Sequence, residues 1–163
     1  MGDVPVVFDV NVLVQAILGG DSSFSTWPTL PPTTDNPAAD CIGVANDGLE
    51  FALWLSPHVL TNTARVLTAA AVAAGDVEEY IAVLTEITQF SGGGVREPPR
   101  TVHDCEDHED NLVLDLAAEV GALLIVSDDT DLTSMSPWRG CPILRPGQFA
   151  ARVDAMRRAR RWQ

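Results

Sequence analysis

The chain has 163 residues, of which 46% are hydrophobic and 20% are charged. This length and balance fit a globular domain with one hydrophobic core and argue against a disordered chain. The formal net charge is −13, and every basic residue is an arginine, because the sequence contains no lysine. General electrostatic attraction to nucleic acid is therefore excluded. Any binding to a phosphate backbone must be local or mediated by a metal ion.

Membrane, secreted and disulfide-stabilised proteins are also disfavoured. No apolar run approaches the roughly 20 residues that a membrane helix needs, and residues 1–5 lack the basic start of a secretory signal. The cysteines, Cys41, Cys105 and Cys141, are odd in number and far apart. This pattern matches neither a disulfide framework nor a Cys-x-x-Cys zinc site. We therefore expect a cytoplasmic protein without a membrane partner.

The first half of the chain alternates between apolar runs and helical patterns. Residues 4–8 are almost continuously apolar, which is typical of a strand buried on both faces of a parallel sheet. A helix is expected over residues 10–18, and residues 19–37, rich in Gly, Ser, Thr and Pro, predict a long loop. The next expected elements are a helix, a strand and two helices, over residues 38–46, 50–55, 57–74 and 77–90.

The second half repeats this alternation. The expected elements are an extended segment, a helix, a strand, a weaker strand and a helix, over residues 95–102, 107–120, 122–126, 142–144 and 147–161. Gly121 directly follows an apolar helix face, where a left-handed residue is preferred. Alternating strands and helices predict an α/β fold with a parallel sheet of four or five strands, helices on both faces and the first strand at the centre. No linker separates two cores, so residues 1–163 are expected to form a single domain.

Aspartates stand where the predicted strands end. Asp9 follows the first strand, Asp128 and Asp129 follow the fourth, and Asp107 and Asp110 begin the helix before it. Because ligands bind at the carboxyl ends of parallel strands, we expect these acids to meet there. Each group alone could be a helix cap or a turn. Their shared edge favours a hard cation, Mg²⁺ or Mn²⁺, which oxygen ligands select.

Four segments, in this order and spacing, resemble the PIN-domain nucleases, the family that includes the VapC toxins. They are residues 6–14 (VVFDVNVLV), 51–57 (FALWLSP), 107–117 (DHEDNLVLDLA) and 124–132 (LIVSDDTDL). The resemblance implies a three-layer α/β/α sandwich and a Mg²⁺- or Mn²⁺-dependent endoribonuclease. The implied catalytic metal ligands are Asp9, Asp110 and Asp129, with Asp107 and Asp131 as further ligand candidates and with Asn11, Asn62 and Ser127 as supporting residues.

The same resemblance implies RNA as the substrate and, for the toxin of a type II toxin–antitoxin pair, an antitoxin protein as a partner. The family usually carries a glutamate where this chain has Asn62, which removes one negative charge. A catalytically weakened PIN module that binds RNA or protein is therefore the alternative. A small α/β phosphotransferase is disfavoured, because such enzymes place a lysine on the phosphate. The oligomeric state is left open, a homodimer included.

Residues 150–163 predict an Arg-rich C-terminal helix or tail. Its arginines could hold RNA phosphates while Trp162 stacks on a base, or the segment could be a solvated helix end. The predicted RNA contacts are Arg157, Arg158, Arg160 and Arg161. Elsewhere, His103, Cys105 and His108 lie close together, but their spacing matches no closed four-ligand zinc site.

Overall fold

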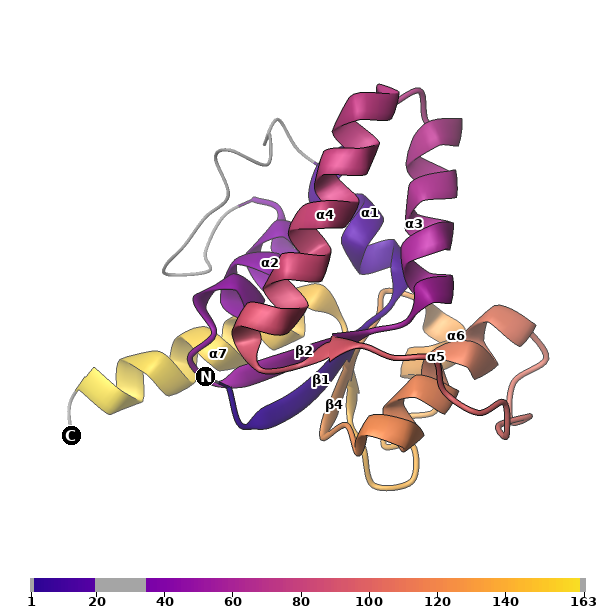
Figure 1. The fold of residues 1–163 in the computed structure, drawn as a ribbon. Coiled ribbons are helices and arrows are strands. Elements are labelled where there is room, and N and C mark those ends of the chain that lie inside the picture. Colours follow the sequence, from indigo (N-terminus) through magenta and orange to yellow (C-terminus); the bar gives the residue numbers. More distant parts are fainter. Residues whose placement is uncertain (1, 20–34, 162–163) are drawn as a thin grey trace.

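A parallel sheet forms the centre of the molecule (Figure 1). The computed structural model describes residues 2–19 and 35–161, and within these residues the sheet has five strands in the order β3-β2-β1-β4-β5. The strands are β1 (Val4–Phe8), β2 (Phe51–Leu55), β3 (Gly94–Val95), β4 (Leu124–Val126) and β5 (Ile143–Leu144). Every pairing is parallel, and β1 is central because it pairs with both β2 and β4. This confirms the predicted α/β class and the predicted place of the first strand.

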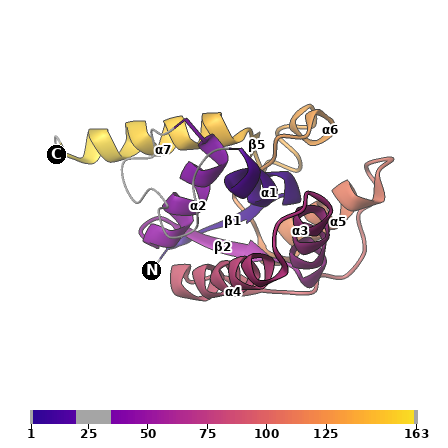
Figure 2. The same ribbon diagram turned by 90° about the horizontal axis from the view of Figure 1, so that it is seen from above.

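Helices cover both faces of the sheet. In the described part of the chain they are α1 (Val10–Leu18), α2 (Pro37–Asp47), α3 (Pro57–Ala69), α4 (Ala74–Ser91), α5 (His108–Val120), α6 (Thr130–Thr133) and α7 (Pro146–Arg161). None of them combines the length and the apolar character that crossing a bilayer requires. Figures 1 and 2 show α3, α5 and α6 grouped at one end of the molecule, with the C-terminal end of α7 at the other.

The hydrophobic core lies in two parts, one on each face of the sheet. Successive side chains of a strand point to opposite faces. Val6 and Phe8 accordingly belong to the part that α1, α2, α3, α4 and α7 cover, whereas Val7 belongs to the part that α5 and α6 cover. All three side chains are fully buried. Burial on both faces explains why the apolar run of β1 is unbroken.

Several element boundaries differ from the sequence-based expectations. Of the extended segment expected over residues 95–102, only Val95 lies in a strand, the two-residue β3, because Pro98 and Pro99 cannot donate to a strand ladder. The helix expected to reach residue 74 ends at Ala69, and Ala71 follows with a left-handed φ of 65°. A helix, α6, also forms directly after Asp129. Most of the loop expected over residues 19–37 lies outside the described residues.

Candidate metal centre at the carboxyl edge of the sheet

A network of polar side chains joins the carboxyl ends of β1 and β4. Asp9 follows β1 and caps α1, and its Oδ1 accepts a hydrogen bond from the Val10 amide at 2.7 Å. Asp9 Oδ2 accepts from the Ser127 hydroxyl at 2.7 Å and from the Asn11 side-chain amide at 3.2 Å. Asn11 Oδ1 in turn accepts from the Asp128 amide at 3.0 Å. The network ties the two strand ends together and fixes the direction of the Asp9 carboxylate.

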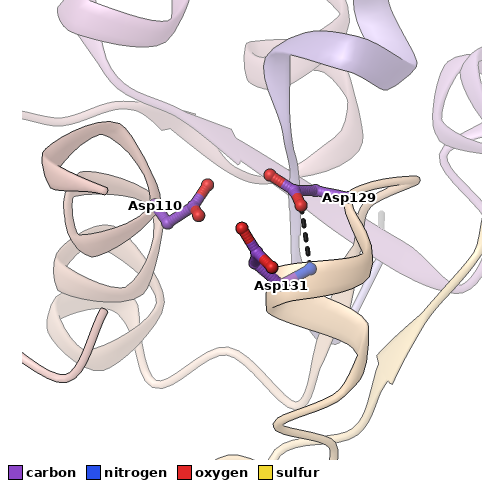
Figure 3. Close-up of side chains that lie close together, drawn as sticks. All are labelled: Asp110, Asp129 and Asp131. Carbon is purple, nitrogen blue, oxygen red and sulfur yellow. Dashed lines mark hydrogen bonds between the residues drawn. The ribbon is translucent and has the colours of Figure 1, made fainter. Parts of the chain in front are cut away.

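Three aspartates from two helices converge beside this network (Figure 3). Asp110 lies in the first turn of α5, Asp129 caps α6, and Asp131 lies in the first turn of α6. One carboxylate oxygen from each lies within 4.8 Å of the others. Asp129 is fixed by its own turn, because its Oδ1 accepts from the Asp131 amide at 2.9 Å and its amide donates to Ser127 Oγ at 3.0 Å. The group is therefore held by backbone geometry on one side and by α5 on the other.

Asp110 has an unusual environment for an acid. It is 5% exposed, and its Oδ2 is buried with no hydrogen-bond partner among the described residues. Burial, followed by the negative charges of Asp129 and Asp107, raises the pKa of the Asp110 carboxyl from 3.8 to about 7. Burial also raises the pKa of Asp9. Acids brought together in this way are typical of sites that bind a cation.

The acids line a cleft of about 380 Å³. Its walls combine acids from α5 and the strand ends with polar side chains from α1 and α3 and with several valines. A second hollow, of about 290 Å³, also has Asp107 and Asp110 in its wall. Asp129 lines the first cavity and Asp131 lines the second. The group of three aspartates thus stands between two spaces, each large enough for an ion and its ligands.

The donors in this group fit a hard divalent cation. All three side chains offer oxygen, which suits Mg²⁺ or Mn²⁺ better than softer metals. The unpartnered Oδ2 of Asp110 is the atom that a cation would satisfy. Within residues 2–19 and 35–161, His103, Cys105 and His108 form no comparable group.

The structure brings the predicted acids to one edge of the sheet. Asp110 and Asp129 lie together, and the third member of their group is Asp131, which the sequence suggested only as a further ligand candidate. Asp9 lines the same cleft as Asp110 and Asp129 but is not part of the close group. Asp107 is exposed and caps α5, accepting from the Glu109 amide at 2.9 Å. The catalytic and ligand roles of these residues stay predictions.

Three ionisable side chains that line the cleft were not predicted: His58, Arg65 and Glu109. Glu109 Oε2 accepts hydrogen bonds from His58 Nε2 and, at 2.6 Å, from Asn62 Nδ2. The bond from His58 lowers the pKa of the Glu109 carboxyl. His58 and Arg65 stand four residues before and three after Asn62, so helical periodicity places all three on one face of α3. That spacing could have identified two of them, whereas Glu109 is set by the packing of α3 beside α5.

Arg157 lies at the opposite edge of the sheet from the acids. Its Nε and Nη2 donate to the two oxygens of Glu50 at 2.8 and 2.7 Å, and its Nη1 donates to Asp47 at 3.1 Å. Glu50 directly precedes β2, so this pairing marks the amino ends of the strands. The Arg157 side chain is 10% exposed. Arg157 therefore anchors α7 to the rest of the protein, and its contact with RNA stays a prediction.

The other tail arginines are more exposed. Arg160 reaches Glu50 at 3.4 Å, and Arg158 pairs with Asp154 at 3.0 Å. Both have side chains that are more than half exposed, and Arg161 is exposed as well. RNA contact through these three arginines stays a prediction, and Trp162 lies outside the described residues.

Comparison with known proteins identifies the family. A family model of the PIN domain matches residues 5–131, a range that contains Asp9, Asp110, Asp129 and Asp131. A search of curated proteins finds no match. Proteins with PIN domains are generally nucleases that use divalent metal ions, which agrees with the parallel sheet and with the group of aspartates at its edge. The chain belongs to the PIN-domain family.

Proposed function

We propose that the protein is a Mg²⁺- or Mn²⁺-dependent endoribonuclease that hydrolyses phosphodiester bonds of RNA. The observation that carries the proposal is the buried, unpartnered Oδ2 of Asp110 beside Asp129 and Asp131. A buried aspartate with a structural role has its oxygens satisfied by the chain. Asp115, on the same helix, is of this kind, because its Oδ1 accepts from the backbone amides of residues 101 and 102 at 2.9 and 2.7 Å.

The residues of the cleft would have different roles in such a reaction. Asp110, Asp129 and Asp131 would hold the ion, and Asp9 adds a carboxylate whose direction Ser127 and Asn11 fix. When bound, the divalent ion supplies an activated water and neutralises charge on the scissile phosphate.

Arg65 is the arginine in the wall of this cleft. Its Nε donates to Asn62, and no carboxylate pairs with its guanidinium within the described ranges. The remaining N–H groups are available to a backbone phosphate, which arginine binds through two parallel hydrogen bonds. We therefore propose Arg65 as the residue that holds RNA next to the reacting phosphate.

The test is RNA cleavage by the purified protein with Mg²⁺ or Mn²⁺ and, separately, with a chelator. Asp110→Ala should abolish cleavage, since the ion loses its buried ligand. Asp3→Ala is a matched control, because Asp3 is an exposed aspartate next to β1 at the amino edge. Cleavage that persists in Asp110→Ala or in the presence of the chelator would contradict the proposal.

We further propose that the protein is the toxin of a type II toxin–antitoxin pair, acts in the cytoplasm and is neutralised by an antitoxin protein. The likeness of four segments to the VapC toxins supports this, together with an acid cleft that is open to solvent. Induced expression in bacteria should arrest growth for the wild type and not for Asp110→Ala. Equal growth of the two strains would count against a toxin.

A catalytically weakened PIN module that binds RNA or protein is the second candidate function. Asn62 favours it, because an amide replaces the acid that the family usually carries on this helix. The cleavage assay separates the two candidates when RNA binding is measured in parallel. Binding without metal-dependent cleavage would favour the module.

A further inference from the structure

Asn62 and Glu109 form a close contact across the wall of the acid cleft. They belong to α3 and α5, and Asn62 Nδ2 donates to Glu109 Oε2 at 2.6 Å. Arg65 Nε donates to Asn62 Oδ1 at 3.3 Å. An arginine N–H has to face an oxygen, so this bond sets the amide with its nitrogen toward Glu109. His58 Nε2 donates to the same oxygen of Glu109 from one turn earlier on α3.

The contact depends on an amide at position 62. An amide nitrogen donates to a carboxylate, whereas an ionised carboxylate has no proton to donate. A glutamate at position 62 would bring a second negative carboxylate close to Glu109, and the two would repel each other. The residue at position 62 and the acid at position 109 are therefore matched to each other.

We propose that Glu109 supplies the carboxylate that position 62 lacks, with Asn62 and His58 as the residues that position it in the metal-binding cleft. This inference rests on the proposed function. Glu109 lines the cleft, and its second oxygen, Oε1, accepts no hydrogen bond from the described residues. The neighbouring Asp110 has its buried, unpartnered Oδ2 in the same cleft. In this proposal α5 carries the acid that the family resemblance implies on α3, so the number of carboxylates around the cleft is kept.

The side chain of Glu109 is 51% exposed, unlike the buried Asp110. The Glu109 carboxylate is therefore open to solvent, and we expect it to act on the ion directly or through a bound water. Partners of this kind change metal affinity by about 10- to 100-fold when they are removed. Glu109→Gln keeps the acceptor for Asn62 and removes only the charge, so it isolates this contribution.

The test is a reciprocal exchange with Mn²⁺ affinity, measured by calorimetry, as the readout. Glu109→Gln should weaken Mn²⁺ binding by about 10-fold or more. The double variant Asn62→Glu with Glu109→Gln should return to within about threefold of the wild type, because it restores one acid and one amide in exchanged positions. Glu78→Gln, an exposed acid on α4, is the matched control and should bind Mn²⁺ as the wild type does.

Thermal unfolding without metal shows that each variant is folded before its affinity is compared. Wild-type affinity in Glu109→Gln would overturn the inference, and so would a double variant as weak as Glu109→Gln. Asp110→Ala separates this outcome from failure of the proposed function. If Asp110→Ala loses Mn²⁺ binding while Glu109→Gln keeps it, only the role of Glu109 is wrong. If Asp110→Ala binds Mn²⁺ normally, the metal centre itself is wrong.

Discussion

Both edges of the sheet bury carboxylates, but the two edges differ in whether an arginine pairs with the buried acid. At the amino edge, Glu50 and Asp47 are held by Arg157, with Arg160 adding a longer contact. At the carboxyl edge, none of the described arginines pairs with Asp110, although it is buried to a similar degree as Glu50. The amino edge therefore pairs its buried acid with an arginine, whereas the carboxyl edge leaves the buried Asp110 without an arginine partner among the described residues.

The pKa values of Glu50 and Asp110 reflect this difference. The hydrogen bond from Arg157 lowers the pKa of the Glu50 carboxyl, whereas burial raises that of Asp110 to about 7. Burial of an acid therefore does not identify a functional site by itself. The absence of a compensating group within the chain is the more useful sign, because it implies that the compensation comes from a ligand.

The largest expected effect is on catalysis at the carboxyl edge. Asp110→Asn should lower RNA cleavage at least about 100-fold, since an uncharged amide is a poor substitute for a buried ligand. Glu50→Gln, at the amino edge, should cleave RNA at the wild-type rate. The measurement is cleavage under saturating Mg²⁺. Comparable losses in both variants would mean that the edges do not differ as described.

Removing Arg157, the arginine of the amino edge, should lower the stability of the fold and leave metal binding intact. Arg157→Ala leaves the buried Glu50 with only the longer contact to Arg160 and removes the partner of Asp47. Breaking a buried ion pair typically destabilises a protein by about 3–5 kcal/mol. Urea denaturation measures the loss. Arg158→Ala serves as the control, because Arg158 forms an exposed surface pair, and such pairs contribute about 0–1 kcal/mol. A tolerated Arg157→Ala would show that the amino-edge pairing is dispensable.

Adding Mg²⁺ or Mn²⁺ should stabilise the folded protein through the acids of the carboxyl edge. An ion that binds only the folded state adds about 2.7 kcal/mol to the free energy of unfolding at 100 times its Kd. We expect Mg²⁺ or Mn²⁺ to raise the melting temperature of the wild type and of Glu50→Gln. The rise should disappear in Asp110→Asn, and a rise of the same size there would place the ion elsewhere.

The stability of the metal-free protein should fall as the pH rises from about 4 to 7. Over this window the folded state binds more protons at Asp110 than the unfolded state does, because its pKa is raised from 3.8 to about 7 on folding. The free energy of unfolding therefore decreases with rising pH at this group. Chemical denaturation at several pH values checks the slope, which should flatten in Asp110→Asn. An unchanged slope would assign the effect to other groups.

The smallest expected effect is on RNA binding, and it should be larger for the arginine in the cleft than for an arginine of the tail. Arg65→Ala should weaken RNA binding and lower its salt-dependence slope by about one, the value of one phosphate contact. Arg161→Ala should change binding less, because Arg161 ends α7. The C-terminal end of α7 lies at the other end of the molecule from α3 and α5, whose residues line the cleft (Figure 1). Binding isotherms at several salt concentrations measure both. A larger effect of Arg161→Ala would support the tail as the main RNA contact.

Local patterns in the sequence predicted the fold well. The unbroken apolar run of β1 predicted a strand buried on both faces, and Gly121, with a left-handed φ of 63°, ends α5 where expected. The aspartates at the strand ends were found because strand ends are readable from the sequence. Each of these signals is carried by residues close together in the chain.

Long-range pairs were beyond such patterns. Arg157 meets Glu50 across 107 residues, so the sequence indicated an exposed basic tail where the structure has an ion pair. Glu109 meets Asn62 across 47 residues, and its direction depends on where α3 and α5 come to lie. The sequence therefore identified the residue types of the site. The partners that orient these residues could be identified only from the three-dimensional structure.

Three of the acids at the carboxyl edge also begin helices. Asp9 caps α1, Asp107 caps α5 and Asp129 caps α6, each with a carboxylate oxygen that accepts from the backbone. An inherited change at any of them would alter the chemistry and the start of a helix together. Neutral drift is therefore restricted here, because an acid cannot be relocated along the chain without relocating a helix. Even a descendant without any activity at this edge would be under selection to keep a capping residue at these positions, and asparagine, which caps without charge, is the first substitution expected in it.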